Sequence, residues 1–304
     1  MDTAAFNLPP VIESALLRLS ERSGLPLFKY GGYLRDRAVG LQSRDLDILV
    51  HGQLDPIKPV LQAALGPDVP LLSVLPKGGT NLLLNLGGQP ANQINQIDLI
   101  DMPRFLDTFG KIPSEDAFTS ACQVADTTDF TVNAVVCGLG STPDFYAHPL
   151  WEADIAQRTV RLIRPELLVQ EYWLIFKAVR LEQRLGGKIC SETEKAIRQT
   201  VQERRWKELI GEKFLTYLFR SLKSSEPWKI AARLWELDSF NDFFPTVLPA
   251  EKLQEEFLQI LNDPTRPSLG ADGKSPWLVG VLLKAQLPEA RRRLTRRSVV
   301  GGLR

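Results

Sequence analysis

The sequence has 304 residues, 44% of them hydrophobic and 24% charged, which is typical of a folded globular protein and favours two domains or one domain with an extension. The formal net charge of +1 means that any attraction to nucleic acid must come from local basic patches. Two histidines and three cysteines without metal-ligand spacing argue against a histidine-rich metal site and indicate reduced thiols. The sequence shows no uninterrupted apolar stretch of membrane-spanning length and no charged-then-apolar leader, so we expect a soluble, cytoplasmic protein without membrane contact.

The first part of the chain combines a predicted helix, strand and glycine turn. Residues 9–22 have helical spacing, with one apolar face made by Val11, Ala15, Leu16 and Leu19. Residues 25–30 then predict a strand, which Gly31-Gly32 interrupts before a short helix over 33–39. Free backbone N–H groups at such a turn suit a phosphate, although a glycine pair alone favours a simple tight turn. P-loop and dinucleotide fingerprints are absent.

The stretch 45–50, DLDILV, predicts a strand with two acidic side chains on one face. Asp45 and Asp47 are two residues apart, and side chains at that spacing point to the same side of a strand. Two neighbouring carboxylates are costly to bury without a counter-charge, and oxygen ligands suit Mg²⁺. The alternative is a solvated edge strand with two surface aspartates.

Two motifs in order give the sequence a family resemblance. The run GGYLRDRAVG…RDLDILV resembles the nucleotide-binding signature of the class II tRNA nucleotidyltransferase and bacterial poly(A) polymerase family. About 80 residues further on, DFTVNAV resembles the DFT-I-NA motif of the same family. A weaker match follows at residues 165–186, and the resemblance covers roughly residues 20–245.

The resemblance implies both a fold and an activity. We expect an α+β architecture, with a nucleotidyltransferase (polymerase beta-like) mixed-sheet head over residues 1–150 and an all-α neck and body with a basic tail over 151–304. The implied reaction adds nucleotides from an NTP (ATP or CTP) to an RNA 3′ end by catalysis with two Mg²⁺ ions. The expected RNA is tRNA, and the addition could be of CCA, of CC or of A. The alternatives are a poly(A) polymerase and an RNA-binding relative that has lost catalysis. Base preference and oligomeric state stay open.

Family members carry a third acidic residue on a strand beside the D-x-D strand. Asp98 fits best, because residues 94, 96, 98 and 100 alternate with Ile97 and Leu99 in a predicted strand, and Asp101 is the second candidate. An acidic strand end without a catalytic role is the alternative for both. The resemblance then implies that Asp45, Asp47 and Asp98 form the catalytic set, and that Asp45 and Asp47 are the main metal ligands.

The remaining motif residues are expected to contact the nucleotide. By resemblance, Gly31 and Gly32 let the triphosphate approach the backbone, Arg35 neutralises it, and Asp36 orients Arg35 or the metal-site loop. In the second motif, the resemblance implies that Asp129 positions the sugar of the nucleotide and that Asn133 supports the metal-site loop.

Two departures from the family pattern put base and phosphate recognition in doubt. Thr127 and Thr128 stand where the family has two arginines, which removes two charge-assisted contacts. In the helix predicted after residue 165, Glu171 matches the family's acidic base-reading residue, but Leu174 replaces its arginine partner and cannot donate to a base. On the same helix, Lys177 and Arg180 match a basic series that is expected to approach the triphosphate. The alternative is that they form a solvated polar face with Glu171.

Further elements follow from periodicity and turn residues. We expect a helix over 52–66, strands over 71–74, 80–86 and 93–100, and an irregular segment over 102–128. Beyond residue 165 the apolar stripes predict a series of helices, one of them entered through a capping box of Ser191 and Glu194. Near the C-terminus, five arginines between Arg291 and Arg297 predict either an RNA-contacting surface or a charged tail.

Overall fold

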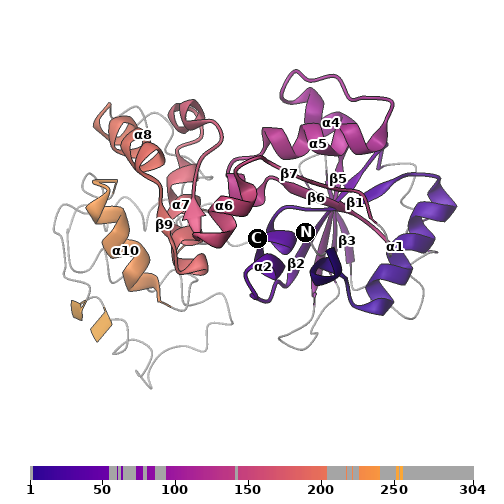
Figure 1. Ribbon diagram of the computed structural model, residues 1–304, viewed down its shortest axis with the longest axis horizontal. Coiled ribbons are helices and arrows are strands. Elements are labelled where there is room, and N and C mark those ends of the chain that lie inside the picture. The colour runs from indigo at the N-terminus through magenta and orange to yellow at the C-terminus, as the bar shows by residue number, and fades with distance from the viewer. Residues whose placement is uncertain are drawn as a thin grey trace, which may run out of the picture. The chain divides into compact units, whose positions relative to one another are not determined.

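A computed structural model describes residues 3–54, 73–77, 81–85, 94–140, 143–203 and 226–239, together with single residues at 60, 63, 217, 221, 251, 252, 254 and 255 (Figure 1). The chain divides into two compact units, Met1–Ile163 and Arg164–Arg304. The expected head, residues 1–150, lies within the first unit.

Within the described residues of the first unit, seven strands form one sheet in the order β3-β4-β5-β2-β1-β6-β7. The central pair, β2 and β5, is parallel, and every other neighbouring pair is antiparallel. This mixed sheet with flanking helices confirms the predicted α+β class. The strands are β1 (Leu27–Tyr30), β2 (Asp45–Val50), β3 (Ser73–Lys77), β4 (Asn81–Asn85), β5 (Gln96–Asp101), β6 (Val135–Gly138) and β7 (Phe145–Ala147).

Two helices, α4 (Met102–Asp107) and α5 (Ala117–Thr127), pack on one face of this sheet (Figure 1). The apolar residues of that layer alternate with residues facing the other way along each strand, as Phe28 and Tyr30 do on β1. Burying this layer fixes which side of β2 and β5 the remaining side chains take. The buried members are Phe28, Tyr30, Leu49, Ile100, Met102, Leu106, Ala121, Val124, Ala125 and Val136.

The N-terminal segment packs against the opposite face. Lys29 alternates with Phe28 and Tyr30, is fully buried, and donates from Nζ to the carbonyl of Phe6, the last residue of the 3-10 turn η1 (Thr3–Phe6), at 3.2 Å. Helix α1 (Pro10–Ser23) follows and ends at Gly24, as predicted. The prediction is confirmed for Ala15, Leu16 and Leu19, which are buried, but it is wrong for Val11, which is 49% exposed; Ile12 is buried in its place.

The expectation of an irregular segment over 102–128 is wrong. Asp101 caps α4 by accepting a hydrogen bond from the backbone N of Arg104, and Asp116 caps α5 through the backbone N of Thr119. The buried face of α5 is made mostly of small side chains, such as Ser120 and Ala121. These produce a weak periodic signal, although they allow the helix to approach the sheet closely.

The described part of the second unit is mainly helical. It contains η4 (Pro165–Val169), α7 (Trp173–Leu185), β9 (Lys188–Ile189), α8 (Ser191–Gln202) and α10 (Pro227–Glu236). The predicted capping box at the start of α8 is wrong, because Cys190 is the cap residue and no side chain caps the helix. Instead, Glu194 accepts hydrogen bonds from Arg198 (Nη2, 2.8 Å) and Arg233 (Nη2, 2.6 Å), which link α8 to α10.

Several expectations fall on residues outside the described part of the structure. They are most of the helix at 52–66, the strand residues before 73, the later helical stripes after residue 203 apart from α10, and the arginines at 291–297.

Candidate active site

Three acidic residues share one face of the two neighbouring strands β2 and β5. Asp47 on β2 pairs in register with Asp98 on β5, and the two strands run parallel, so both side chains project from the same face. Asp45 lies two residues before Asp47 and shares this face. The three acids become progressively more enclosed: Asp45 is exposed, Asp47 is partly buried and Asp98 is 6% exposed. The set therefore runs from the surface into the sheet.

Asp101, the second candidate for the third acid, has a different role. It is three residues from Asp98, so it faces the other side of the sheet, and it is only 2% exposed. Its Oδ1 accepts the backbone N–H of Arg104 at 2.9 Å and caps α4. These contacts favour Asp98 as the third member of the set.

The acidic side chains of this face offer only oxygen ligands to a divalent cation. Among the described residues, no three or more His, Cys, Asp or Glu side chains are gathered as a ready-made metal cluster. The carboxylates of Asp45, Asp47 and Asp98 nevertheless share one face of neighbouring strands, and an oxygen-only set of this kind suits a hard ion such as Mg²⁺. The chemistry of the donors therefore fits such an ion.

The glycine turn follows the end of β1 that lies beside Asp47 on β2. Tyr30, the last residue of β1, pairs in register with Asp47, and Gly31 follows it directly. Gly31 has φ 66° and ψ −121°, outside the left-handed region that other residues enter, so this position requires glycine. Gly32 begins the short helix α2 (Gly32–Ala38). The turn thus brings a buried glycine, Gly31, and a partly exposed one, Gly32, close to the carboxylates without a side chain at either position.

The second motif is folded against the first. Asp129 and Phe130 precede the 3-10 turn η3 (Thr131–Asn133), which leads into β6. The backbone N of Gly31 donates to the carbonyl of Val135 at 3.0 Å. Side chains add a second link, because Arg35 Nη1 donates to Asn133 Oδ1 at 2.6 Å. The two motifs, distant in sequence, therefore form one structural group.

Arg35 and Asp36 are interior residues. They are 7% and 1% exposed, and the guanidinium donates from both Nε (2.9 Å) and Nη2 (2.6 Å) to Asp36 Oδ1. On the other side of Asn133, its amide Nδ2 donates to Asp129 Oδ1 at 3.0 Å. Arg35 is thus engaged within the protein on two sides.

Tyr30 lies beside Asp47 in the sheet and is a further candidate for the site. Burial raises the pKa of its phenol well above the usual value; the hydrogen bond to Thr128 opposes this rise, and the charges of Asp129 and Asp47 add to it. Its hydroxyl donates to Thr128 Oγ1 at 2.7 Å. Tyr30 therefore lies close to an acid from each motif. In the sequence, the feature that could have pointed to Tyr30 is its position directly before Gly31 and Gly32.

The two threonines that replace family arginines have structural partners. Thr127 is 3% exposed, and its hydroxyl donates to the carbonyls of Val124 (2.8 Å) and Gln123 (3.1 Å) in α5. Thr128 Oγ1 accepts a hydrogen bond from the hydroxyl of Tyr30. Thr127 is therefore an interior residue whose hydroxyl bonds to its own helix.

In the second unit, Leu174 is a core residue, 2% exposed. Its neighbours Glu171, Trp173 and Lys177 form a half-buried group: Trp173 Nε1 donates to Glu171 Oε2, and Lys177 Nζ lies 5.8 Å from the indole centroid. The Trp173 ring stacks on that of Tyr217, with centroids 4.3 Å apart. Arg180 lies one turn further along the same face of α7 as Lys177.

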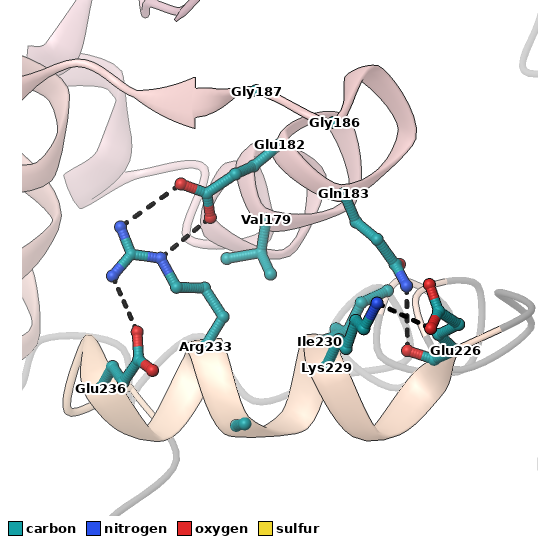
Figure 2. Close-up of a pocket in the computed structure, with 11 residues that line it drawn as sticks. Val179, Glu182, Gln183, Gly186, Gly187, Glu226, Lys229, Ile230, Arg233 and Glu236 are labelled. Carbon is teal, nitrogen blue, oxygen red and sulfur yellow. Dashed lines mark hydrogen bonds and ion pairs between the residues drawn. The ribbon is translucent and has the colours of Figure 1, made fainter. Parts of the chain in front are cut away.

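The opposite side of α7 forms an open cavity of about 600 Å³ with α10 (Figure 2). Figure 2 shows Arg233 held by Glu182 and Glu236, and Gln183 directed toward Glu226. None of the predicted nucleotide-binding residues lines it. This part of the unit therefore joins α7 to α10 through ion pairs.

Comparison with known proteins defines the class to which the fold and motifs point. The chain superposes on a CCA-adding enzyme solved with ATP with a TM-score of 0.73 and 18% identity, covering 97% of this chain and 67% of that one. For the Thermotoga maritima CCA-adding enzyme complexed with tRNA, the TM-score is 0.68 at 20% identity, covering 98% and 68%. The fold is therefore that of the CCA-adding nucleotidyltransferases.

A curated relative agrees with this class. The chain is 24% identical over 252 residues to the A-adding tRNA nucleotidyltransferase of Geobacter sulfurreducens. The match covers 81% of this chain and 27% of the relative, so it spans about a quarter of that protein's length. No protein-family model matches the sequence. The resemblance to the tRNA nucleotidyltransferase family is thus confirmed by sequence similarity and by fold. In the described part of the chain, no helix is both long and apolar enough to span a membrane.

Proposed function

We propose that this protein transfers nucleotides from an NTP to the 3′ end of an RNA, and that the RNA is tRNA. The observation that carries the proposal is the in-register pairing of Asp47 with Asp98, on the same face as Asp45 and beside the Gly31 turn. The names of the similar proteins, A-adding and CCA-adding enzymes with ATP and tRNA as bound partners, support this reaction class. A cytoplasmic location is part of the proposal.

A divalent cation, Mg²⁺ in our proposal, would be held by Asp45, Asp47 and Asp98. When bound, it supplies charge stabilisation at the transferred phosphate and increases the acidity of the attacking hydroxyl. Asp98 is the most enclosed of the three. Little water reaches it to screen its charge, so replacing Asp98 should change the electrostatic potential of the site strongly.

The other motif residues would bind and orient the nucleotide. Gly31 and Gly32 carry no side chains, and the partly exposed backbone at Gly32 would let a phosphate approach, while the buried Gly31 sets the turn. Asp129 would hold the sugar, in a position fixed by Asn133. In the second unit, Glu171 offers a carboxylate that can accept a hydrogen bond from a base amino group, while Lys177 and Arg180 offer positive charge for phosphate.

A second candidate function is RNA binding without catalysis. It is favoured by Leu174, which is buried where the family has a base-reading arginine, and by Thr127, which is buried where the family has a phosphate-contacting arginine. Neither residue can supply the missing cationic contact from these positions.

The test is incubation of the purified protein with Mg²⁺, each labelled NTP separately or in mixtures, and tRNA lacking part or all of its 3′ CCA. We expect incorporation of one to three nucleotides that stops at the mature end. Long homopolymer tails would instead identify a poly(A) polymerase. Tight tRNA binding with no incorporation from any NTP would overturn the proposal and identify the inactive relative.

A further inference from the structure

Four side chains form a continuous hydrogen-bonded series between the two motifs. Asp36 Oδ1 accepts from Arg35 Nε and Nη2, Arg35 Nη1 donates to Asn133 Oδ1, and Asn133 Nδ2 donates to Asp129 Oδ1. The distances are 2.9, 2.6, 2.6 and 3.0 Å. We call this series the Asp36–Asp129 strut. It spans 98 residues of sequence at the contact between Arg35 and Asn133.

The strut is built from enclosed groups. Arg35, Asp36 and Asn133 are 7%, 1% and 6% exposed, so their hydrogen bonds are made away from bulk water and are expensive to break. The planar guanidinium uses two edges at once, one toward Asp36 and one toward Asn133. This fixes the plane of Arg35 and, with it, the carboxamide of Asn133.

At its far end, the strut determines the orientation of Asp129. The carboxylate oxygen Oδ1 accepts from Asn133 Nδ2 and also from the backbone N of Phe130 at 2.9 Å. With Oδ1 held from two directions, rotation of the Asp129 side chain is restricted. Nearby, the charge of Asp129 contributes to the raised pKa of Tyr30, as does that of Asp47, which indicates that Asp129 lies close to the carboxylate set.

We propose that Arg35 is a positioning residue: it holds Asn133 and, through it, presents Asp129 to the sugar of the nucleotide, rather than neutralising the triphosphate. This inference rests on the proposed function for the identity of the ligand. The sequence resemblance assigned Arg35 to the triphosphate. The two roles predict different responses to ligands with and without a sugar.

The test measures binding of ATP and of inorganic tripolyphosphate, with Mg²⁺, by isothermal titration calorimetry on the full-length protein. Asn133→Ala removes the link to Asp129 and keeps the buried Arg35–Asp36 pair, so the fold should be retained. Arg35→Met would leave Asp36 buried without its cation, so the variant used is Arg35→Met with Asp36→Asn. Arg35→Lys keeps the charge but cannot bridge Asp36 and Asn133 with one ammonium.

If Arg35 is a positioning residue, all three variants weaken ATP binding by about tenfold and leave tripolyphosphate binding unchanged. Combining Asn133→Ala with Arg35→Met and Asp36→Asn should weaken ATP binding no further, because all these changes break one series. If Arg35 contacts the triphosphate, Arg35→Met with Asp36→Asn weakens tripolyphosphate binding, Arg35→Lys largely preserves it, and Asn133→Ala adds a separate loss. That pattern would overturn the inference.

A kinetic readout separates this inference from the proposed function. In the nucleotide-addition assay, Asn133→Ala and Arg35→Lys should lower kcat/KM for ATP to the same extent, by about tenfold. If the wild-type protein adds no nucleotide, the proposed function fails. The comparison between ATP and tripolyphosphate binding then still tests the strut, since it requires no catalysis; equal losses for both ligands, or no loss for either, would contradict it.

Discussion

In the first unit, hydrogen bonds connect polar side chains of the two motifs, whereas in the second unit Leu174, at the position of the family's base-reading arginine, lies in the hydrophobic core. Asp45, Asp47 and Asp98 share one face of the sheet, and the Asp36–Asp129 strut ties the second motif to the first. Leu174 instead packs inside its helical unit. The difference indicates that the two motifs fold as one group in the first unit, whereas position 174 offers no hydrogen-bond donor to a base in the second.

The largest expected effect sharpens the assignment within the first unit. Asp98→Asn removes a charge from the carboxylate set at nearly constant size and should lower nucleotide addition by about 100-fold or more. Asp101→Asn is the matched control, since asparagine is also a good helix cap and should retain both activity and stability. Initial rates of labelled-NTP incorporation, with circular dichroism to check folding, decide the comparison. Equal losses in both variants would contradict the choice of Asp98.

The next prediction could break the comparison in the second unit. Leu174→Arg restores the family residue but places a cation in the core, so it should lower the free energy of unfolding by about 3 kcal/mol or more and give no new choice between ATP and CTP. Leu174→Met, a volume-conserving control, should cost less than about 1.5 kcal/mol. Urea unfolding and the ATP-to-CTP incorporation ratio measure the two effects. A stable Leu174→Arg protein with improved base selection would show that position 174 faces the nucleotide.

A smaller effect is expected at the glycine turn. Gly31→Ala forces a side chain into a backbone conformation with φ 66° and ψ −121°, which should cost about 1–3 kcal/mol of stability. Gly24→Ala, where φ is 69° and ψ 11°, places alanine in the left-handed region and should cost about 1 kcal/mol. Thermal unfolding of both variants tests this order. The reverse order would mean that the turn does not require glycine.

The smallest effect concerns the ion pairs that join α8 to α10. Partial burial raises the pKa of the Glu194 carboxyl, but hydrogen bonds from Arg233 and Arg198 outweigh it, so the pKa lies below its usual value. Its contribution to stability is therefore complete above the pKa of the unfolded chain and is lost as the pH falls through the lower folded pKa.

The corresponding measurement is the melting temperature as a function of pH. Glu194→Gln should flatten the decline of the melting temperature below about pH 4.5, the ordinary value for a glutamate. Glu203→Gln, one residue past the end of the same helix, serves as the control and should leave the pH profile close to that of the wild type. Identical profiles for Glu194→Gln and the wild type would contradict the ion-pair account.

Much of the sheet could be predicted from the sequence because alternation is a local signal. The strand at 45–50 and the shared face of Asp45 and Asp47 followed from residue spacing alone. Helix α5 was missed because its buried face consists mostly of small and polar side chains, although Asp116 three residues before Thr119 was a usable capping signal.

Long-range pairing could not be predicted in the same way. The register of Asp47 with Asp98 depends on β2 and β5 becoming parallel neighbours, although β3 and β4 lie between them in the sequence. The contact of Arg35 with Asn133 likewise arises only when β1 and β6 pair. For this reason, the resemblance could associate Arg35 with the nucleotide, but only the fold shows which side chains it touches.

The most direct test of the central claim is nucleotide addition to 3′-truncated tRNA by the Asp47→Asn protein, compared with wild type and with the exposed control Asp107→Asn. The carboxylate set predicts incorporation by wild type and by Asp107→Asn, and a loss of about 100-fold or more for Asp47→Asn with an unchanged circular dichroism spectrum. Incorporation by Asp47→Asn at the wild-type rate would contradict the assignment of catalysis to these carboxylates.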